Sequence, residues 1–168
     1  MCVTFLYYAI AIDNTILPAL SEIYLDQSEA TTNTAKHVDK LLNYLASNTH
    51  AEIQYIASGM QLGIHSDASY LSVAQSRRQV SGVHFLSEDP PDPDNAENSV
   101  PSTNGILLVV CKIMRNIMVS ATEAEYGTIF VNAQTAVPIR TTISEMGWKQ
   151  EPTAIQVENS TEVGIATK

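Results

Sequence analysis

Three acidic side chains occupy positions from which they could bind metal ions together. Asp67 is predicted to end a strand over 62–66, Glu158 to end a short strand over 154–157, and Glu125 to lie one turn into a helix. Hard cations such as Mg²⁺ require oxygen ligands, and two such ions about 4 Å apart can orient a water molecule and stabilise a leaving oxygen. The alternative is that these groups are solvated surface residues, which is common in an acidic chain.

The strands that would position these carboxylates are predicted from alternating polar and apolar residues. Residues 52–58 and 60–68 alternate on either side of Gly59, which predicts a hairpin. Two further strands are expected over 81–86 and 105–112, antiparallel to each other and on one side of the strand that ends at Asp67. The strand over 154–157 is expected on the other side and parallel, so the fold class is α/β with a mixed sheet.

The helices are predicted from apolar residues at helical spacing and from capping residues. Ser120 and Glu123 form a capping-box pattern at the start of the longest helix, which is expected to cross one face of the sheet and to end at Gly147. Pro138 removes a backbone donor inside this pattern, which predicts a kink or two consecutive helices. A further helix is expected to begin over 159–166.

The domain organisation is predicted as two parts. Residues 1–50 form a helical connecting segment, with a capped helix that begins near Asp13, and residues 51–168 form the α/β domain. Residues 88–104 contain four of the seven prolines, five acids and no basic residue, which predicts a disordered loop. The apolar run at 1–12 is shorter than the roughly 20 residues that span a bilayer and lacks a basic start, so a buried segment is favoured over a secretory signal.

An ordered set of motifs resembles the ribonuclease H domain of copia-type retrotransposon polyproteins, and the resemblance covers nearly the whole chain. Upstream stretches are similar to the segment that joins reverse transcriptase to that domain. The stretches similar to the ribonuclease H domain are His65–Leu71, Ser76–Arg78, Gly82–Ser87, Met118–Gly127, Ala136–Thr142 and Ile155–Thr161, and the upstream ones are Phe5–Ala9, Ile16–Leu20 and Lys40–Leu45.

The resemblance implies a ribonuclease H-like fold and cleavage of the RNA strand of RNA–DNA hybrids with Mg²⁺ or Mn²⁺. It implies Asp67, Glu125 and Glu158 as the catalytic, metal-binding carboxylates. Glu123 lies about 200° around the helix from Glu125, so it cannot face the same site and is interpreted as a capping residue. His65 matches no ligand of the family and is interpreted as a packed or surface histidine.

Two departures from the family pattern predict that this copy is inactive. Glu158 stands where the family has aspartate, and the extra methylene moves the carboxylate by more than the half-ångström tolerance of a preorganised site. The fourth carboxylate of the family would lie beyond Lys168, so the domain is expected to be incomplete at its C-terminus. Two hypotheses therefore stand: a hybrid-cleaving nuclease, and a catalytically inactive ribonuclease H-like remnant or interaction module.

Composition narrows the partners and the compartment. The net charge of −9 argues against binding nucleic acid through bulk positive charge. Cys2 and Cys111 are too few for a disulfide framework, and the four histidines are scattered without a paired metal-ligand spacing. The expected partners are an RNA–DNA hybrid, if the domain is active, and the reverse transcriptase part of the family's polyprotein. No membrane contact is expected. The expected compartment is intracellular, either cytoplasmic or nuclear.

Overall fold

The computed structural model describes residues 2–73, 77–87, 104–114 and 120–157. The chain divides into two compact units, Met1–Ile53 and Gln54–Lys168, and each is considered by itself. The predicted loop over 88–104, apart from Asn104, and the predicted helix over 159–166 lie outside the described residues. Among the helices that the structure describes, none is long and apolar enough to cross a membrane.

The first unit is helical. Asp13 accepts a hydrogen bond from the Thr15 amide at 3.1 Å, which confirms the predicted cap, and Pro18 lies in the first turn of the helix that follows. Thr31 and Thr34 form a reciprocal capping box on the third helix. The elements of this unit are α1 (Cys2–Ala11), the 3₁₀ turn η1 (Asn14–Ile16), α2 (Leu17–Leu25), the 3₁₀ turn η2 (Asp26–Glu29) and α3 (Thr32–Ser47).

The prediction of a buried N-terminal segment is only partly right. Ala9 of α1 is buried, but Tyr7 is 78% exposed and Ile10 is 55% exposed. Because nearly every residue of α1 is apolar, a helix that packs along one face must leave apolar side chains on its other face.

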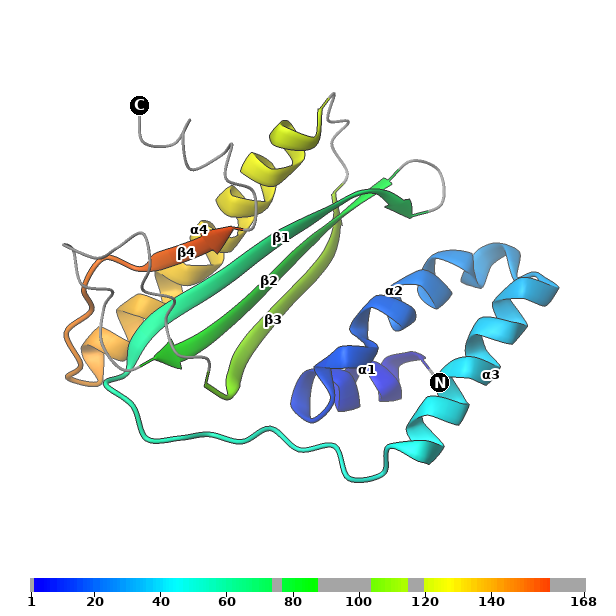
Figure 1. Ribbon diagram of the computed structural model, residues 1–168, viewed down its shortest axis with the longest axis horizontal. Helices are drawn as coiled ribbons and strands as arrows, with labels where there is room; N and C mark the ends of the chain where they lie inside the picture. The colour runs from blue at the N-terminus through cyan, green and yellow to red at the C-terminus, as the bar shows by residue number, and fades with distance from the viewer. Residues whose placement is uncertain (1, 74–76, 88–103, 115–119, 158–168) are drawn as a thin grey trace. The chain divides into compact units, whose positions relative to one another are not determined.

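The second unit is α/β and contains a mixed four-stranded sheet in the order β3-β2-β1-β4 (Figure 1). Strand β1 pairs antiparallel with β2 and parallel with β4, and β2 pairs antiparallel with β3. The mixed sheet, with β2 and β3 on one side of β1 and the parallel β4 on the other, is the one predicted from the sequence. The strands are β1 (Gln61–Val73), β2 (Arg77–Ser87), β3 (Ile106–Met114) and β4 (Ala154–Val157).

Helix α4 (Ala121–Glu145) lies behind the sheet in the view of Figure 1 and packs on β1 and β2. Its buried residues recur at helical spacing, which makes one stripe that faces the sheet. The stripe consists of Ala124, Thr128, Asn132, Ala136 and Ile143. The apolar core between helix and sheet contains Leu62, Ile64, Ala136 and Ile143, with Met60, Leu86, Ile139 and Ile155 packed against it.

The predicted hairpin of 52–58 with 60–68 is wrong. No strand forms over 51–60, and β2 is the antiparallel partner of β1. The side chain of Asn104 takes the place of a strand partner: its Oδ1 accepts from the Ile56 amide at 2.8 Å, and its Nδ2 donates to the Ile56 carbonyl at 2.7 Å. An extended segment can therefore form hydrogen bonds through its backbone amide and carbonyl groups without joining the sheet.

Two consecutive helices around Pro138 are also ruled out, because α4 continues through this residue to Glu145. Pro138 and Gln134 are both exposed, so the carbonyl that loses its helical partner can bind water. The predicted helix end is confirmed, since Gly147 has φ of +99° immediately after the C-cap Met146.

Candidate functional site

The side of the sheet away from α4 carries a small polar pocket. Ser66 accepts a hydrogen bond from Asn132 of α4, so Ser66 faces the helix and its neighbours His65 and Asp67 point to the opposite face. The pocket has a volume of about 360 Å³. It is lined by His65, Ser66, Asp67, Ser81, Val83, Gln156 and Val157.

Asp67 is exposed and does not end its strand, contrary to the prediction. Strand β1 runs on to Val73, because its pairing with β2 continues past Asp67 through the partners Ser69 and Gln79. The pairing with β4 does stop here: Ser66 and Val157 are its last described partners. Asp67 therefore lies where β1 passes the described end of its parallel neighbour.

Glu125 lies one turn into α4 and is half-buried, whereas Glu123 is exposed. The Ser120 hydroxyl accepts from the Glu123 amide at 3.1 Å, which confirms Ser120 as the helix cap. Glu125 thus belongs to the helix on one face of the sheet, while Asp67 points to the other face.

The third predicted carboxylate, Glu158, lies outside the described residues and follows Val157 in the sequence. Within the described residues, no group of three or more histidine, cysteine, aspartate or glutamate side chains is arranged to hold a metal ion. The structure therefore describes Asp67 and Glu125 but gives no complete carboxylate site.

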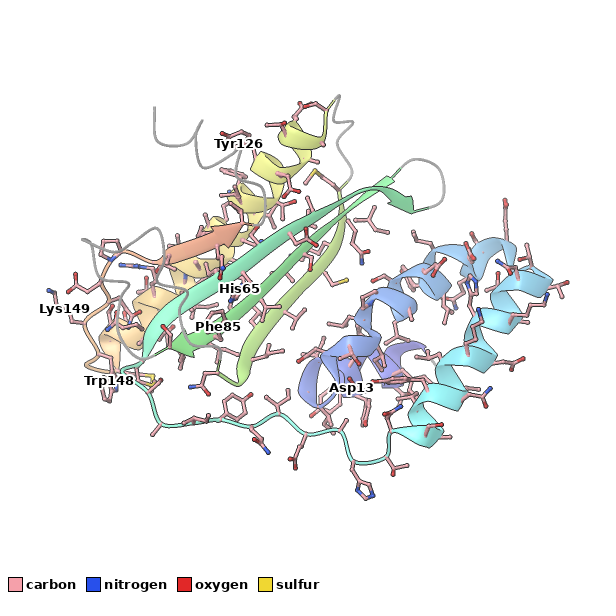
Figure 2. All side chains as sticks on the ribbon, viewed as in Figure 1. Asp13, His65, Phe85, Tyr126, Trp148 and Lys149 are labelled. Carbon is pink, nitrogen blue, oxygen red and sulfur yellow. The ribbon has the colours of Figure 1, made fainter. Side chains whose placement is uncertain are left out.

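His65 is held in place by an aromatic contact. Its ring stacks on Phe85 with the ring centroids 4.9 Å apart, and Figure 2 shows the two side chains on neighbouring strands. Gly63 makes room for Phe85, since a Cβ at Gly63 would lie 2.9 Å from the Phe85 ring. Burial lowers the pKa of His65, so the imidazole is neutral at pH 7.

Polar residues meet beneath α4, which the sequence analysis did not predict. Asn132 is fully buried and donates to Ser66 Oγ at 3.0 Å and to the Ser81 carbonyl at 3.1 Å. His84, also fully buried, lies 3.4 Å through Nε2 from the Asn132 carbonyl. The available signal was the position of Asn132 in the sheet-facing stripe, where a polar residue needs partners from the sheet.

A second pocket, of about 420 Å³, lies in the helical unit between α2 and α3. Glu22 and His37 approach there to 3.7 Å, and the Thr15 and Tyr44 hydroxyls lie 2.9 Å apart. The two hydroxyls hydrogen-bond to each other, whereas His37 Nδ1 is buried and makes no hydrogen bond within the described residues. The remaining lining residues are Ile16, Ala19, Lys40 and Leu41.

Comparisons of the chain with protein-family models, with curated proteins and with solved structures each returned no match.

Proposed function

We propose that residues 51–168 are a ribonuclease H-like domain of the kind found in copia-type retrotransposon polyproteins, whose reaction is hydrolysis of the RNA strand of an RNA–DNA hybrid. One observation carries the proposal: the sheet order β3-β2-β1-β4, with β4 parallel to the central β1 and reached through the helix α4. The described parts of the ribonuclease H-like motifs lie on β1, β2, α4 and β4, in that order along the chain. Fold likeness alone does not establish an activity, so the site must be tested directly.

In this proposal, Asp67, Glu125 and Glu158 would hold Mg²⁺ or Mn²⁺, which when bound would activate a water molecule and stabilise the leaving oxygen. The donor chemistry fits, because carboxylates are the hard ligands that these cations prefer. Asp67 is exposed and accessible to a phosphate backbone. The ligand count falls short within the described residues, where no three such groups converge.

A second candidate, a ribonuclease H-like module that does not cleave, is supported by specific observations. Asp67 and Glu125 belong to opposite faces of the sheet, and Glu158 is one methylene longer than the aspartate of the family pattern. Because catalytic groups must be held to about half an ångström, the longer Glu158 side chain should weaken metal binding. The net charge of −9 also disfavours an anionic hybrid. We therefore expect little or no cleavage by the chain as written.

The test is to incubate the full chain with a labelled RNA–DNA hybrid and Mg²⁺ or Mn²⁺. Four proteins are compared: the unaltered chain, Asp67→Asn, Glu158→Asp, and the double variant. If the longer carboxylate is the defect, Glu158→Asp gains metal-dependent cleavage of the RNA strand, and the double variant loses it again.

The other outcomes also decide between the candidates. Cleavage by the unaltered chain that Asp67→Asn abolishes would overturn the non-cleaving candidate. Cleavage that survives Asp67→Asn points to a contaminating nuclease. Silence in all four proteins would refute the hydrolytic proposal and leave the non-cleaving module.

A further inference from the structure

On the open face of the sheet, one nitrogen atom and two oxygen-bearing groups that could bind a metal ion line the same pocket. His65 and Asp67 are two residues apart on β1, so both project from the same face. Gln156 of β4 is the Cα partner of His65 in the parallel register, and residues paired in this way lie on the same face about 5 Å apart. All three line the 360 Å³ pocket.

Two side-chain atoms of residues that line this pocket are buried and have no hydrogen-bond partner. His65 Nε2 and Gln156 Oε1 are inaccessible to solvent and make no hydrogen bond within the described residues. A buried polar atom without a partner is destabilising, so such atoms require an explanation. His84 Nδ1 and Asn132 Oδ1 share this condition beneath α4, and His37 Nδ1 shares it in the pocket between α2 and α3, whereas His65 and Gln156 bring two such atoms to one pocket beside Asp67.

From this placement we propose that His65 Nε2, the Asp67 carboxylate and Gln156 Oε1 form a binding site for one divalent transition-metal ion, Zn²⁺ in the first place. A site with an imidazole nitrogen, a carboxylate and an amide oxygen suits borderline cations, whereas Mg²⁺ prefers oxygen ligands alone. Three protein ligands leave a fourth position for water in tetrahedral Zn²⁺ geometry. The stack on Phe85 holds the imidazole in place and limits the ordering cost on binding.

This site is separate from the proposed hydrolytic site but shares Asp67 with it. It depends on His65 and Gln156 and does not involve Glu125. A Zn²⁺ ion bound here would occupy the Asp67 carboxylate and withhold it from Mg²⁺. The site therefore predicts that Zn²⁺ inhibits any Mg²⁺-dependent cleavage that depends on Asp67.

The experiment is calorimetric titration of the untagged full chain with Zn²⁺, Mn²⁺ and Mg²⁺ in separate runs near pH 7.5. We expect one Zn²⁺ per chain, with affinity in the order Zn²⁺ over Mn²⁺ over Mg²⁺. His65→Phe retains an aromatic ring on Phe85 and should weaken Zn²⁺ binding at least about tenfold. Gln156→Leu retains similar volume and should weaken it several-fold.

Two matched variants act as controls. His37→Ala removes a histidine that lies beside a carboxylate, Glu22, in the helical unit, and Glu125→Gln removes a ligand of the proposed hydrolytic site. Neither should change Zn²⁺ affinity by more than about twofold. Melting curves without metal establish that each variant folds, and Zn²⁺ should raise the Tm of the unaltered chain but not that of His65→Phe.

Zn²⁺ affinity that is unchanged in both His65→Phe and Gln156→Leu, or lost in His37→Ala, would overturn the inference. Failure of hybrid cleavage would not affect it, because the Zn²⁺ titration requires no catalysis. Conversely, cleavage restored by Glu158→Asp without any Zn²⁺ site would leave the proposed function intact.

Discussion

The face of the sheet that α4 covers and the face that it leaves open are built from alternate residues of the same strands. On the covered face of β1, Ile64 packs in the apolar core and Ser66 accepts a hydrogen bond from Asn132. On the open face, the intervening His65 and Asp67 line a pocket. A shift of one residue in register would exchange the two sets, so the pairing of β1 with β2 and β4 decides which side chains are available for chemistry.

The difference between the faces lies in what fixes each side chain. Under α4, apolar packing and the two hydrogen bonds donated by Asn132 hold helix and sheet together. On the open face, His65 is positioned by one ring contact and Asp67 by none that the structure describes. Substitutions of Ile64, Ser66 or Asn132 should therefore change stability, and substitutions of His65 or Asp67 should change binding.

The largest expected effect is the loss of a core side chain on the covered face. Ile64 is 1% exposed, and Ile64→Ala should lower the free energy of unfolding by about 2–5 kcal/mol, because it removes buried surface and leaves a cavity. Val83 is half-buried on the open face, so Val83→Ala should cost less. Urea unfolding of both variants measures the difference, and equal losses would contradict the assignment of the two faces.

The next largest effect is expected at Gly82. A Cβ at this position would lie 2.0 Å from Asn132 Oδ1, so Gly82→Ala should cost about 1–3 kcal/mol of stability through overpacking. Replacing Asn132 with alanine removes the amide group that the new Cβ would meet, and so relieves the clash. In a double-mutant cycle, the Gly82→Ala cost should be smaller in an Asn132→Ala background than in the unaltered chain. Additive losses would show that the two side chains do not meet.

The sequence predicted the sheet better than it predicted the site. Local alternation located β2 and β3, and the order of strands along the chain predicted their partners. It could not identify 52–58 as an extended segment outside the sheet, because Asn104, whose side chain hydrogen-bonds to Ile56, is far away in the sequence. Nor could it reveal that His65 and Gln156 share a pocket, since that depends on the register between β1 and β4.

The predicted carboxylates illustrate the same limit. Motif spacing selected Glu125 over Glu123, and the structure has the first half-buried and the second exposed. Spacing did not reveal that Asp67 and Glu125 belong to opposite faces. That relation follows from which β1 residues point toward α4.

A smaller effect is expected from pH. Burial lowers the pKa of His84, although the carbonyls of Asn132 and Leu108 partly offset it. The unfolded chain then takes up the proton first as the pH falls. Stability is therefore full above about 6.5 and declines as the pH drops from there through the folded pKa. Burial lowers the pKa of His65 as well, so it contributes in the same direction.

Unfolding free energies between pH 7.5 and pH 5 separate the two histidines. His84→Leu should flatten the dependence more than His65→Phe, because His84 is fully buried and His65 only partly. If His65→Phe flattened the pH dependence of the unfolding free energy more than His84→Leu, the proposed contrast between the faces would be wrong.

The smallest effect is expected at Asp67. Because this carboxylate is exposed, Asp67→Asn should change the free energy of unfolding by less than about 0.5 kcal/mol. Metal binding should nevertheless be lost. A thermal melt together with the Zn²⁺ titration tests both statements on one preparation, and a large drop in Tm would mean that Asp67 supports the fold.

The position of β1 in the sheet also has a consequence for biosynthesis. One of its neighbours, β2, follows almost immediately along the chain, whereas β4 is reached only after β3 and α4. On a ribosome that adds about 5–20 residues per second, β1 waits several seconds for its parallel neighbour. During that interval the β1 edge that later receives β4 presents free amide and carbonyl groups to other chains. Premature release of the nascent chain before β4 would therefore yield a product prone to aggregation, whereas the helical unit is complete long before that point.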